Sequence, residues 1–128
     1  MPLGPEENIV RAICTDKYDK ETGRISPSLF DKRGNTSVSR LSLISLEDHW
    51  DLFRLKIQKP PERILELIGE INVGVLQEIG RTYQNPTELT LEPDPLDWNH
   101  AHAVIPQKIT PGLATQIVQK LKRHRKSV

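Results

Sequence analysis

The sequence predicts a single α+β domain, in which a small antiparallel or mixed sheet of four to five strands packs with two mid-chain helices and one C-terminal helix. Its 128 residues are close to the commonest length for one domain with one hydrophobic core. Apolar residues recur at helical spacing in some segments and alternate with polar residues in others. We therefore treat residues 1–128 as one domain.

Two strands are expected in the first third of the chain. Residues 8–14 form a short apolar run that contains β-branched residues, which favours a strand. Residues 36–44 alternate between small polar and apolar side chains, which predicts a second strand. The alternation slips in phase near Arg40, where a β-bulge is expected.

Two helices are expected in the middle of the chain. Ser45 followed by Asp48 resembles a capping box and predicts a helix over residues 46–58. The apolar residues that recur at helical spacing in it are Leu46, Trp50, Phe53 and Ile57. Pro61 is suited to the first turn of a second short helix, which would carry Ile64, Leu65, Leu67, Ile68 and Ile71.

The second half of the sequence predicts three strands and a helix. Residues 73–79 form an apolar run bounded by glycines, residues 88–92 alternate cleanly, and residues 100–105 form the last strand. Thr110 and Pro111 then predict the start of a helix. The residues expected to face the core are Leu89, Leu91, Leu113, Ile117 and Leu121. We expect Trp50 to pack on the sheet face that carries Leu89 and Leu91.

Composition restricts the class of protein. Cys14 is the only cysteine, which excludes an internal disulfide and a cysteine-based zinc site. No segment has the roughly 20 consecutive apolar residues of a membrane helix, and the first residues lack the basic and apolar regions of a secretion signal. We therefore expect a cytoplasmic protein that has no contact with a membrane and no cofactor.

The basic residues are concentrated at the C-terminus. Residues 1–119 hold 13 basic and 17 acidic side chains, and the remaining five cations are Lys120, Lys122, Arg123, Arg125 and Lys126. Such a cluster could bind nucleic acid phosphates or an acidic protein surface. It is also typical of a helix end, where cations complement the dipole. We expect residues 122–128 to form a basic tail that is dispensable for folding.

Polar chemistry is densest at residues 94–105. In the strand expected over residues 100–105, His100 and His102 would project from the same face. Together with Asp97 or Asp94 they could bind a metal ion. The favoured interpretation is that both histidines face solvent or form hydrogen bonds. A further alternative to metal binding is that His102 is a catalytic residue.

A second set of candidates would bind an anion. It consists of Arg24, Ser26, Ser28, Arg40 and His102. Two guanidinium groups with hydroxyls between them suit bidentate binding of a phosphate or a carboxylate. The alternative is that both serines cap turns around Pro27 while the arginines pair with surface acids.

Three segments of the chain resemble a family of small bacterial proteins. The segments are residues 24–30, 37–40 and 99–105, and the family pattern is Gly-Arg-[Ile/Val]-Ser-Ser-x-x-Phe, then Leu-Ser-Val-x-Arg, then Asn-Pro-x-His-Ala-x-Ile. The chain departs from it at Pro27, where the family often has serine, and at Thr36, where the family has leucine. The resemblance implies a bacterial cytoplasmic protein and no particular activity.

These features favour a protein-interaction module, which could be the accessory or neutralising member of a two-gene system. Its support is the basic C-terminus on an acidic body and the lack of an assembled catalytic motif. The alternative is a small enzyme or ligand-binding domain that acts on a phosphate-bearing, nucleotide-like substrate through the anion candidates. A weaker alternative is nucleic-acid binding through the C-terminal cations.

Overall fold

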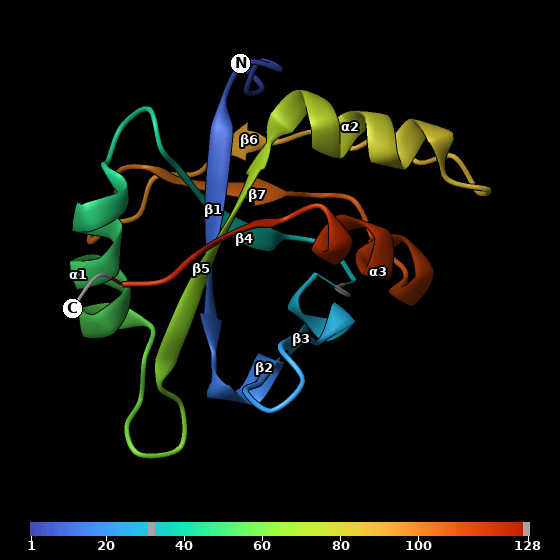
Figure 1. The fold of residues 1–128 in the computed structure, drawn as a ribbon. Helices are drawn as coiled ribbons and strands as arrows, with labels where there is room; N and C mark the ends of the chain where they lie inside the picture. Colours follow the sequence, from blue (N-terminus) through green and yellow to red (C-terminus); the bar gives the residue numbers. More distant parts are fainter. Residues whose placement is uncertain (31–32, 127–128) are drawn as a thin grey trace.

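The computed structural model describes residues 1–30 and 33–126 and shows an α+β fold (Figure 1). The main sheet has the strand order β6-β7-β4-β1-β5-β8, and all its neighbouring strands are antiparallel. Its strands are β1 (Asn8–Cys14), β4 (Thr36–Arg40), β5 (Leu65–Asn72), β6 (Glu92–Pro93), β7 (His102–Ile105) and β8 (Lys122–His124). A separate two-stranded sheet contains β2 (Tyr18–Asp19) and β3 (Arg24–Ile25). The helices are α1 (Leu46–Lys56), α2 (Val73–Thr82) and α3 (Pro111–Gln119), with short 3-10 helices η1 (Thr15–Lys17) and η2 (Pro27–Leu29).

The predicted fold class is confirmed, but the main sheet has six strands rather than four or five. Helix α1 begins where the capping pattern placed it, since the Ser45 side chain accepts a hydrogen bond from the Asp48 amide. Helix α3 begins at Pro111, as predicted. No helix in the described part of the chain is long and apolar enough to cross a membrane.

Two adjacent segments have the opposite structure to the one predicted. Residues 65–72, expected in a helix, form β5, and residues 73–82, expected to begin as a strand, form α2. Strand β5 lies between β1 and β8 and is buried on both faces, so its apolar residues run almost continuously instead of alternating. The Asn72 side chain caps α2 by accepting from the Val75 amide.

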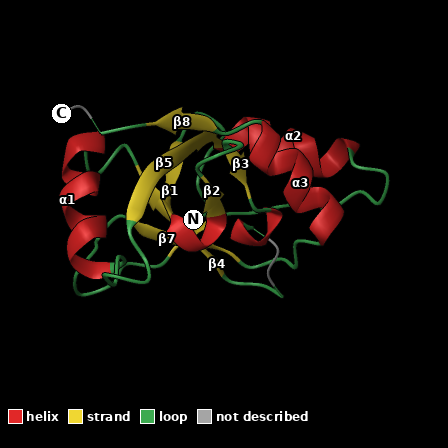
Figure 2. Ribbon diagram, turned by 60° about the horizontal axis from the view of Figure 1, so that its bottom comes forward, coloured by secondary structure: helices red, strands yellow, loops and turns green. Residues whose placement is uncertain are grey.

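Figure 2 shows α1 on one side of the main sheet and α2 and α3 on the other. Apolar side chains pack on both faces of this sheet. Helices α2 and α3 cover the face with the larger core, to which Ile13, Leu67, Phe30, Leu76, Leu89, Leu91, Leu113 and Ile117 belong. Helix α1 covers the other face, where Trp50 and Phe53 pack with Val10, Cys14, Leu65 and Ile68. The prediction that Trp50 shares a face with Leu89 and Leu91 is therefore wrong, because those leucines lie on the α2 side.

Strands β1 and β4 pair over only two residue positions. Ile9 lies opposite Arg40 and Val10 lies opposite Ser39, and the pairing ends there. Figure 1 shows β4 and β7 lying across the direction of β1 and β5. The sheet therefore opens between β1 and β4 beyond Val10.

The first part of the expected basic tail is an edge strand. Lys122, Arg123 and His124 form β8 and pair with β5, and residues 127–128 lie outside the described residues. The His124 imidazole contacts the Glu70 carboxylate at 2.7 Å. Arg125 donates to the Tyr18 hydroxyl at 2.9 Å. These contacts make residues 122–125 part of the folded domain.

Deleting residues 122–128 should lower the free energy of unfolding by about 3 kcal/mol, because three backbone pairs with β5 are lost at about 1 kcal/mol each. The expectation of a dispensable tail is thereby reversed. Urea unfolding of the truncated chain measures the effect. Deleting only residues 126–128 keeps β8 and is the matched control, with an expected change below about 0.5 kcal/mol. Equal stabilities of the two truncated chains would contradict the prediction.

Candidate functional site

A cleft of about 280 Å³ opens where β1 and β4 separate, and residues from both faces of the sheet line it. Its walls come from β1, β4, α1, the loop before β7 and the segments around η1 and residue 63. The apolar lining residues are Val10, Ala12, Leu29, Val38, Phe53, Ile57, Leu96 and Trp98. The polar ones are Arg11, Cys14, Asp16, Lys17, Ser37, Ser39, Arg63, Asn99 and His102. The cleft thus combines an apolar wall with a set of convergent polar groups, as ligand sites do.

Arg11 lies where the pairing of β1 and β4 ends. Its Nη1 donates to the Ser37 carbonyl oxygen at 2.6 Å, and its Nε donates to the Leu29 carbonyl oxygen at 2.8 Å. Burial lowers the pKa of Arg11 to about 10, which leaves the guanidinium charged at neutral pH. The side chain therefore replaces the missing backbone pairing and brings a positive charge to the cleft.

A buried hydrogen-bonded chain joins β4, α1 and the loop before β7. The Ser39 Oγ lies 2.6 Å from the His49 Nε2, and the Asn99 Nδ2 donates to the Ser39 Oγ at 3.1 Å. His49 Nδ1 lies 3.0 Å from the Ser45 carbonyl oxygen, which can only accept, so Nδ1 carries the proton. Burial lowers the pKa of His49 below its ordinary value, which favours the neutral ring. The Nε2 of this neutral ring accepts a hydrogen bond from the Ser39 hydroxyl.

His102 lies directly opposite Ser39 across the β4–β7 pairing, so the two side chains share the cleft face. Its Nδ1 lies 2.7 Å from the Asp94 carbonyl oxygen and 3.4 Å from the Asp94 carboxylate. Because a carbonyl oxygen can only accept, Nδ1 carries a proton. His102 is largely buried and lines the cleft. Its place in the cleft makes it a candidate binding or catalytic group.

The Cys14 thiol is a poor nucleophile in this cleft. Burial and the nearby Asp16 carboxylate raise the pKa of the thiol to about 11. A thiol with that pKa is almost entirely protonated at neutral pH, and the thiolate is the reactive form. The Ser39 hydroxyl, by contrast, lies within hydrogen-bond distance of a histidine nitrogen.

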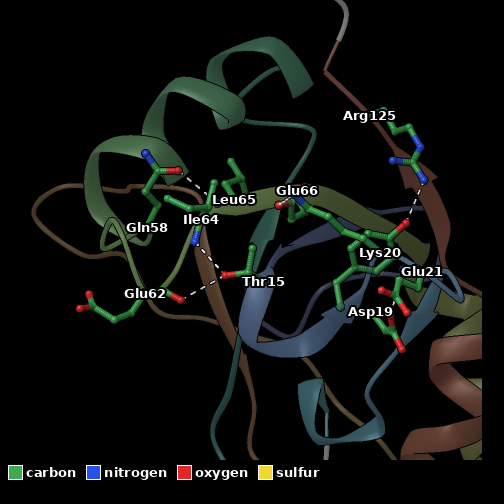
Figure 3. A network of polar contacts seen from close by, with 11 residues as sticks. Thr15, Asp19, Lys20, Glu21, Gln58, Glu62, Ile64, Leu65, Glu66 and Arg125 are labelled. Atoms are coloured by element: carbon green, nitrogen blue, oxygen red, sulfur yellow. Dashed lines mark hydrogen bonds and ion pairs between the residues drawn. The ribbon is translucent and has the colours of Figure 1, made fainter.

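The rim of the cleft is held by contacts from the loop between α1 and β5 to the end of β1 (Figure 3). The Thr15 hydroxyl donates to the Glu62 carbonyl oxygen and accepts from the Ile64 amide. Gln58 accepts from the Leu65 amide at 3.1 Å. These contacts fix the segment that carries Arg63, whose guanidinium lies 3.6 Å from the Asp16 carboxylate.

The expected anion candidates fall into separate places. Ser26 caps η2 by accepting from the Ser28 amide, and the two hydroxyls lie 2.7 Å apart. The capping role weighed as an alternative is thus present for Ser26. Arg24 is exposed, and with Ser26 it lines a second depression of about 220 Å³. Lys17 lines both hollows and donates to the Ser28 hydroxyl at 2.9 Å.

Arg40 is engaged elsewhere. Its Nε and Nη2 donate to one carboxylate oxygen of Glu7 at 3.0 and 2.9 Å. Ser42 also donates to this carboxylate, through its amide and its hydroxyl. Although burial opposes ionisation of Glu7, these hydrogen bonds outweigh it and lower the pKa of the carboxyl. The structure therefore brings Arg40 to Glu7 and not to Ser26 or Ser28.

The two histidines expected to share a strand face do not share one. Strand β7 begins at His102, whereas His100 lies exposed in the preceding turn. The turn is closed by Leu96 and Asn99, whose backbones exchange two hydrogen bonds. Asp97 is also exposed there. In the part of the chain that the structure describes, no three acidic, histidine or cysteine side chains are grouped to hold a metal ion.

Sequence reasoning missed the cleft residues Arg11, Lys17, Ser39 and Asn99, and also His49, which lies behind Ser39. The sequence places Ser39 in a strand, and it offers His49, near the start of a helix, only as a distant metal ligand. The sequence carried a signal for Ser39. Ser37 and Ser39 alternate along β4 and give it one face of small polar side chains, on which another element can pack closely. No sequence signal links Ser39 to His49 on α1, because the two residues lie ten positions apart in different elements.

The three segments on which the sequence-based resemblance rests all contribute to the cleft. Residues 24–30 contribute Leu29, residues 37–40 contribute Ser39, and residues 99–105 contribute Asn99 and His102. No protein-family model, no curated protein and no solved structure matches this chain in the comparisons.

Proposed function

We propose that this domain binds a small phosphate-bearing molecule with a flat apolar body in the cleft between β1, β4 and α1. The observation that carries the proposal is the joint presence of an apolar wall, three cations and the His102 imidazole in one cleft. Its volume lies close to the lower end of the roughly 300 to 1,000 Å³ typical of ligand sites. A nucleotide-like molecule is the simplest ligand of this kind.

The charges of the cleft favour an anion. Among the residues that the structure describes, Arg11, Lys17 and Arg63 line it together with one carboxylate, Asp16. Arg63 pairs with Asp16, which leaves Arg11 and Lys17 as the excess positive charge. Guanidinium and ammonium groups at the wall of a cleft attract phosphate, and screening by salt is weaker there than at an open surface.

The apolar part of the ligand would lie between α1 and the loop before β7. Phe53 and Ile57 project from α1 and its end, and Trp98 comes from the loop. Trp98 is half-buried, so part of its indole is open to a ligand. Stacking of a flat ring on such an indole contributes about 0.5 to 1.5 kcal/mol beyond the buried area.

Phenyl phosphate should stabilise the protein more than inorganic phosphate, because it offers the cleft both a charge and a ring. When phenyl phosphate is present at one hundred times its dissociation constant, the free energy of unfolding should rise by about 2.7 kcal/mol. Thermal unfolding with phenyl phosphate, a nucleoside monophosphate and inorganic phosphate measures it. A panel in which no compound raises the unfolding temperature would contradict the proposal.

Variants of the cleft should separate its charge from its apolar wall. Lys17→Gln and Trp98→Ala should each raise the dissociation constant for phenyl phosphate about tenfold, which is about 1.4 kcal/mol. Lys56→Gln, at the exposed end of α1, is the matched control and should leave it unchanged. Equal affinities of Lys17→Gln and Lys56→Gln would show that the phosphate binds outside this cleft.

A second candidate function is the interaction module expected from the sequence, and the edge strand β8 favours it. β8 is the last strand of the sheet, and Lys120, Lys122 and Lys126 are exposed on it or beside it. An extended acidic protein segment could add to such an edge as a further strand. Lys122→Glu should then weaken binding of an acidic peptide in fluorescence anisotropy, and higher salt should weaken it further. Equal binding by a duplex oligonucleotide would favour the nucleic-acid alternative instead.

A further inference from the structure

The Ser39 hydroxyl has the surroundings of an activated nucleophile. Its oxygen lies 2.6 Å from the basic nitrogen of His49, and the other ring nitrogen of His49 is held by the Ser45 carbonyl oxygen. A nucleophile, a base within hydrogen-bond reach and a third group that orients the base form the arrangement used in covalent catalysis. Ser39 lines the cleft and is itself 2% exposed, so a substrate must enter the cleft to meet it.

Two further groups converge on the same point. The Asn99 side-chain amide donates to the Ser39 oxygen at 3.1 Å and is itself oriented by the Ala101 amide, which donates to its carbonyl oxygen. His102 lies across the strand pair from Ser39. The Asn99 amide also has a second N–H, and a donor that reaches the oxygen of an attacked carbonyl stabilises the negative charge that develops on it.

We infer that Ser39 and His49 form a nucleophile and general-base pair that hydrolyses an ester of a small organic anion in the cleft. The inference rests on the proposed function, because the ester must enter the same cleft. Asn99, through its second N–H, is the donor to the developing oxyanion. His102, Lys17 and Arg11 bind the rest of the molecule.

The reaction balances with water as the only co-reactant. The Ser39 Oγ bonds to the ester carbonyl carbon while its proton passes to the His49 Nε2. The bond from that carbon to the leaving oxygen then breaks, and His49 returns the proton to the leaving alcohol. Water next attacks the acyl group on Ser39 and gives its proton to His49, which returns it to the Ser39 oxygen. The products are the alcohol and the free acid.

A short alkyl fluorophosphonate tests this pair with the full-length protein. The Ser39 oxygen would bond to phosphorus and fluoride would leave, while the proton passes through His49 to the solvent. Intact mass and peptide mapping should then locate a single adduct on Ser39. His49→Gln should slow its formation at least about a hundredfold, as expected for loss of a general base. Thr115→Ala, which removes an exposed hydroxyl on α3, is the control and should label like the wild type.

The outcomes separate this inference from the proposed function. A wild-type protein that is stabilised by phenyl phosphate but forms no adduct on Ser39 overturns the inference and leaves the binding function in place. Labelling of Ser39 at the same rate in His49→Gln also overturns it, because the histidine would then be only structural. Should a variant fail to fold, the position of the adduct in the wild-type protein decides.

Discussion

Replacing Trp50 with alanine should destabilise the protein by about 3 to 5 kcal/mol, the usual loss for a buried aromatic side chain. Trp50 is 6% exposed and packs in the smaller core between α1 and the sheet. This core has few other large members, so α1 cannot close over the space that the indole leaves. Urea unfolding followed by circular dichroism measures the change.

Leu55→Ala is the matched control on the same helix. Leu55 is 75% exposed, so its replacement should change the free energy of unfolding by less than about 0.5 kcal/mol. The loss of Trp50 should also reduce binding of phenyl phosphate, because Phe53 on the same helix lines the cleft. A cost below about 1 kcal/mol for Trp50→Ala would mean that α1 is not held to the sheet by this core.

The sequence predicts the fold class and two of the helices because these depend on local signals. Ser45 and Thr110 with Pro111 mark helix starts, and the spacing of apolar residues in α1 continues for three turns. Strand β5 could not be predicted in this way. Its burial on both faces depends on β1 and β8, which are distant in sequence, and a continuous apolar run is compatible with either structure.

The boundary between β5 and α2 carried a usable signal. Asn72 is a favoured N-cap residue, and Leu76 and Ile79 follow at helical spacing. The β-branched residues Val73 and Val75 favoured a strand instead. Packing of α2 on the larger core outweighs that preference, since tertiary burial supplies most of the stability of a short helix.

The candidate site could be predicted only in part. His102 was singled out because polar residues are dense around it, and it does line the cleft. Its partners depend on strand register: Ser39 is opposite His102 only because β4 and β7 pair with that alignment. His49 contacts Ser39 from α1, which packs on one face of the sheet. Sequence periodicity does not tell which face of the sheet a given helix covers.

Arg40→Gln should destabilise the protein by about 3 kcal/mol at pH 7, because it leaves the Glu7 carboxylate buried without its cation. The Glu7 side chain is 8% exposed and the Arg40 side chain 25%, and their closest atoms are 2.9 Å apart. The sequence predicts Arg40 at an anion-binding site, whereas in the structure its guanidinium is the counterion of the Glu7 carboxylate.

Acid should remove the difference between the wild-type protein and Arg40→Gln. The folded-state pKa of Glu7 is lowered from its ordinary value of 4.5, so the stability it contributes is fully present above about pH 4.5. That contribution is lost as the pH falls through the lowered pKa, where a neutral carboxyl no longer needs the guanidinium. Urea unfolding of both proteins from pH 7 to pH 3 measures the convergence. Arg81→Gln is the matched control, because its pair with Glu78 is exposed at both ends and contributes about 0.5 kcal/mol or less at any pH. Equal losses at positions 40 and 81 would show that the Glu7 carboxylate is solvated and that β4 is not fastened to the N-terminal segment by this pair.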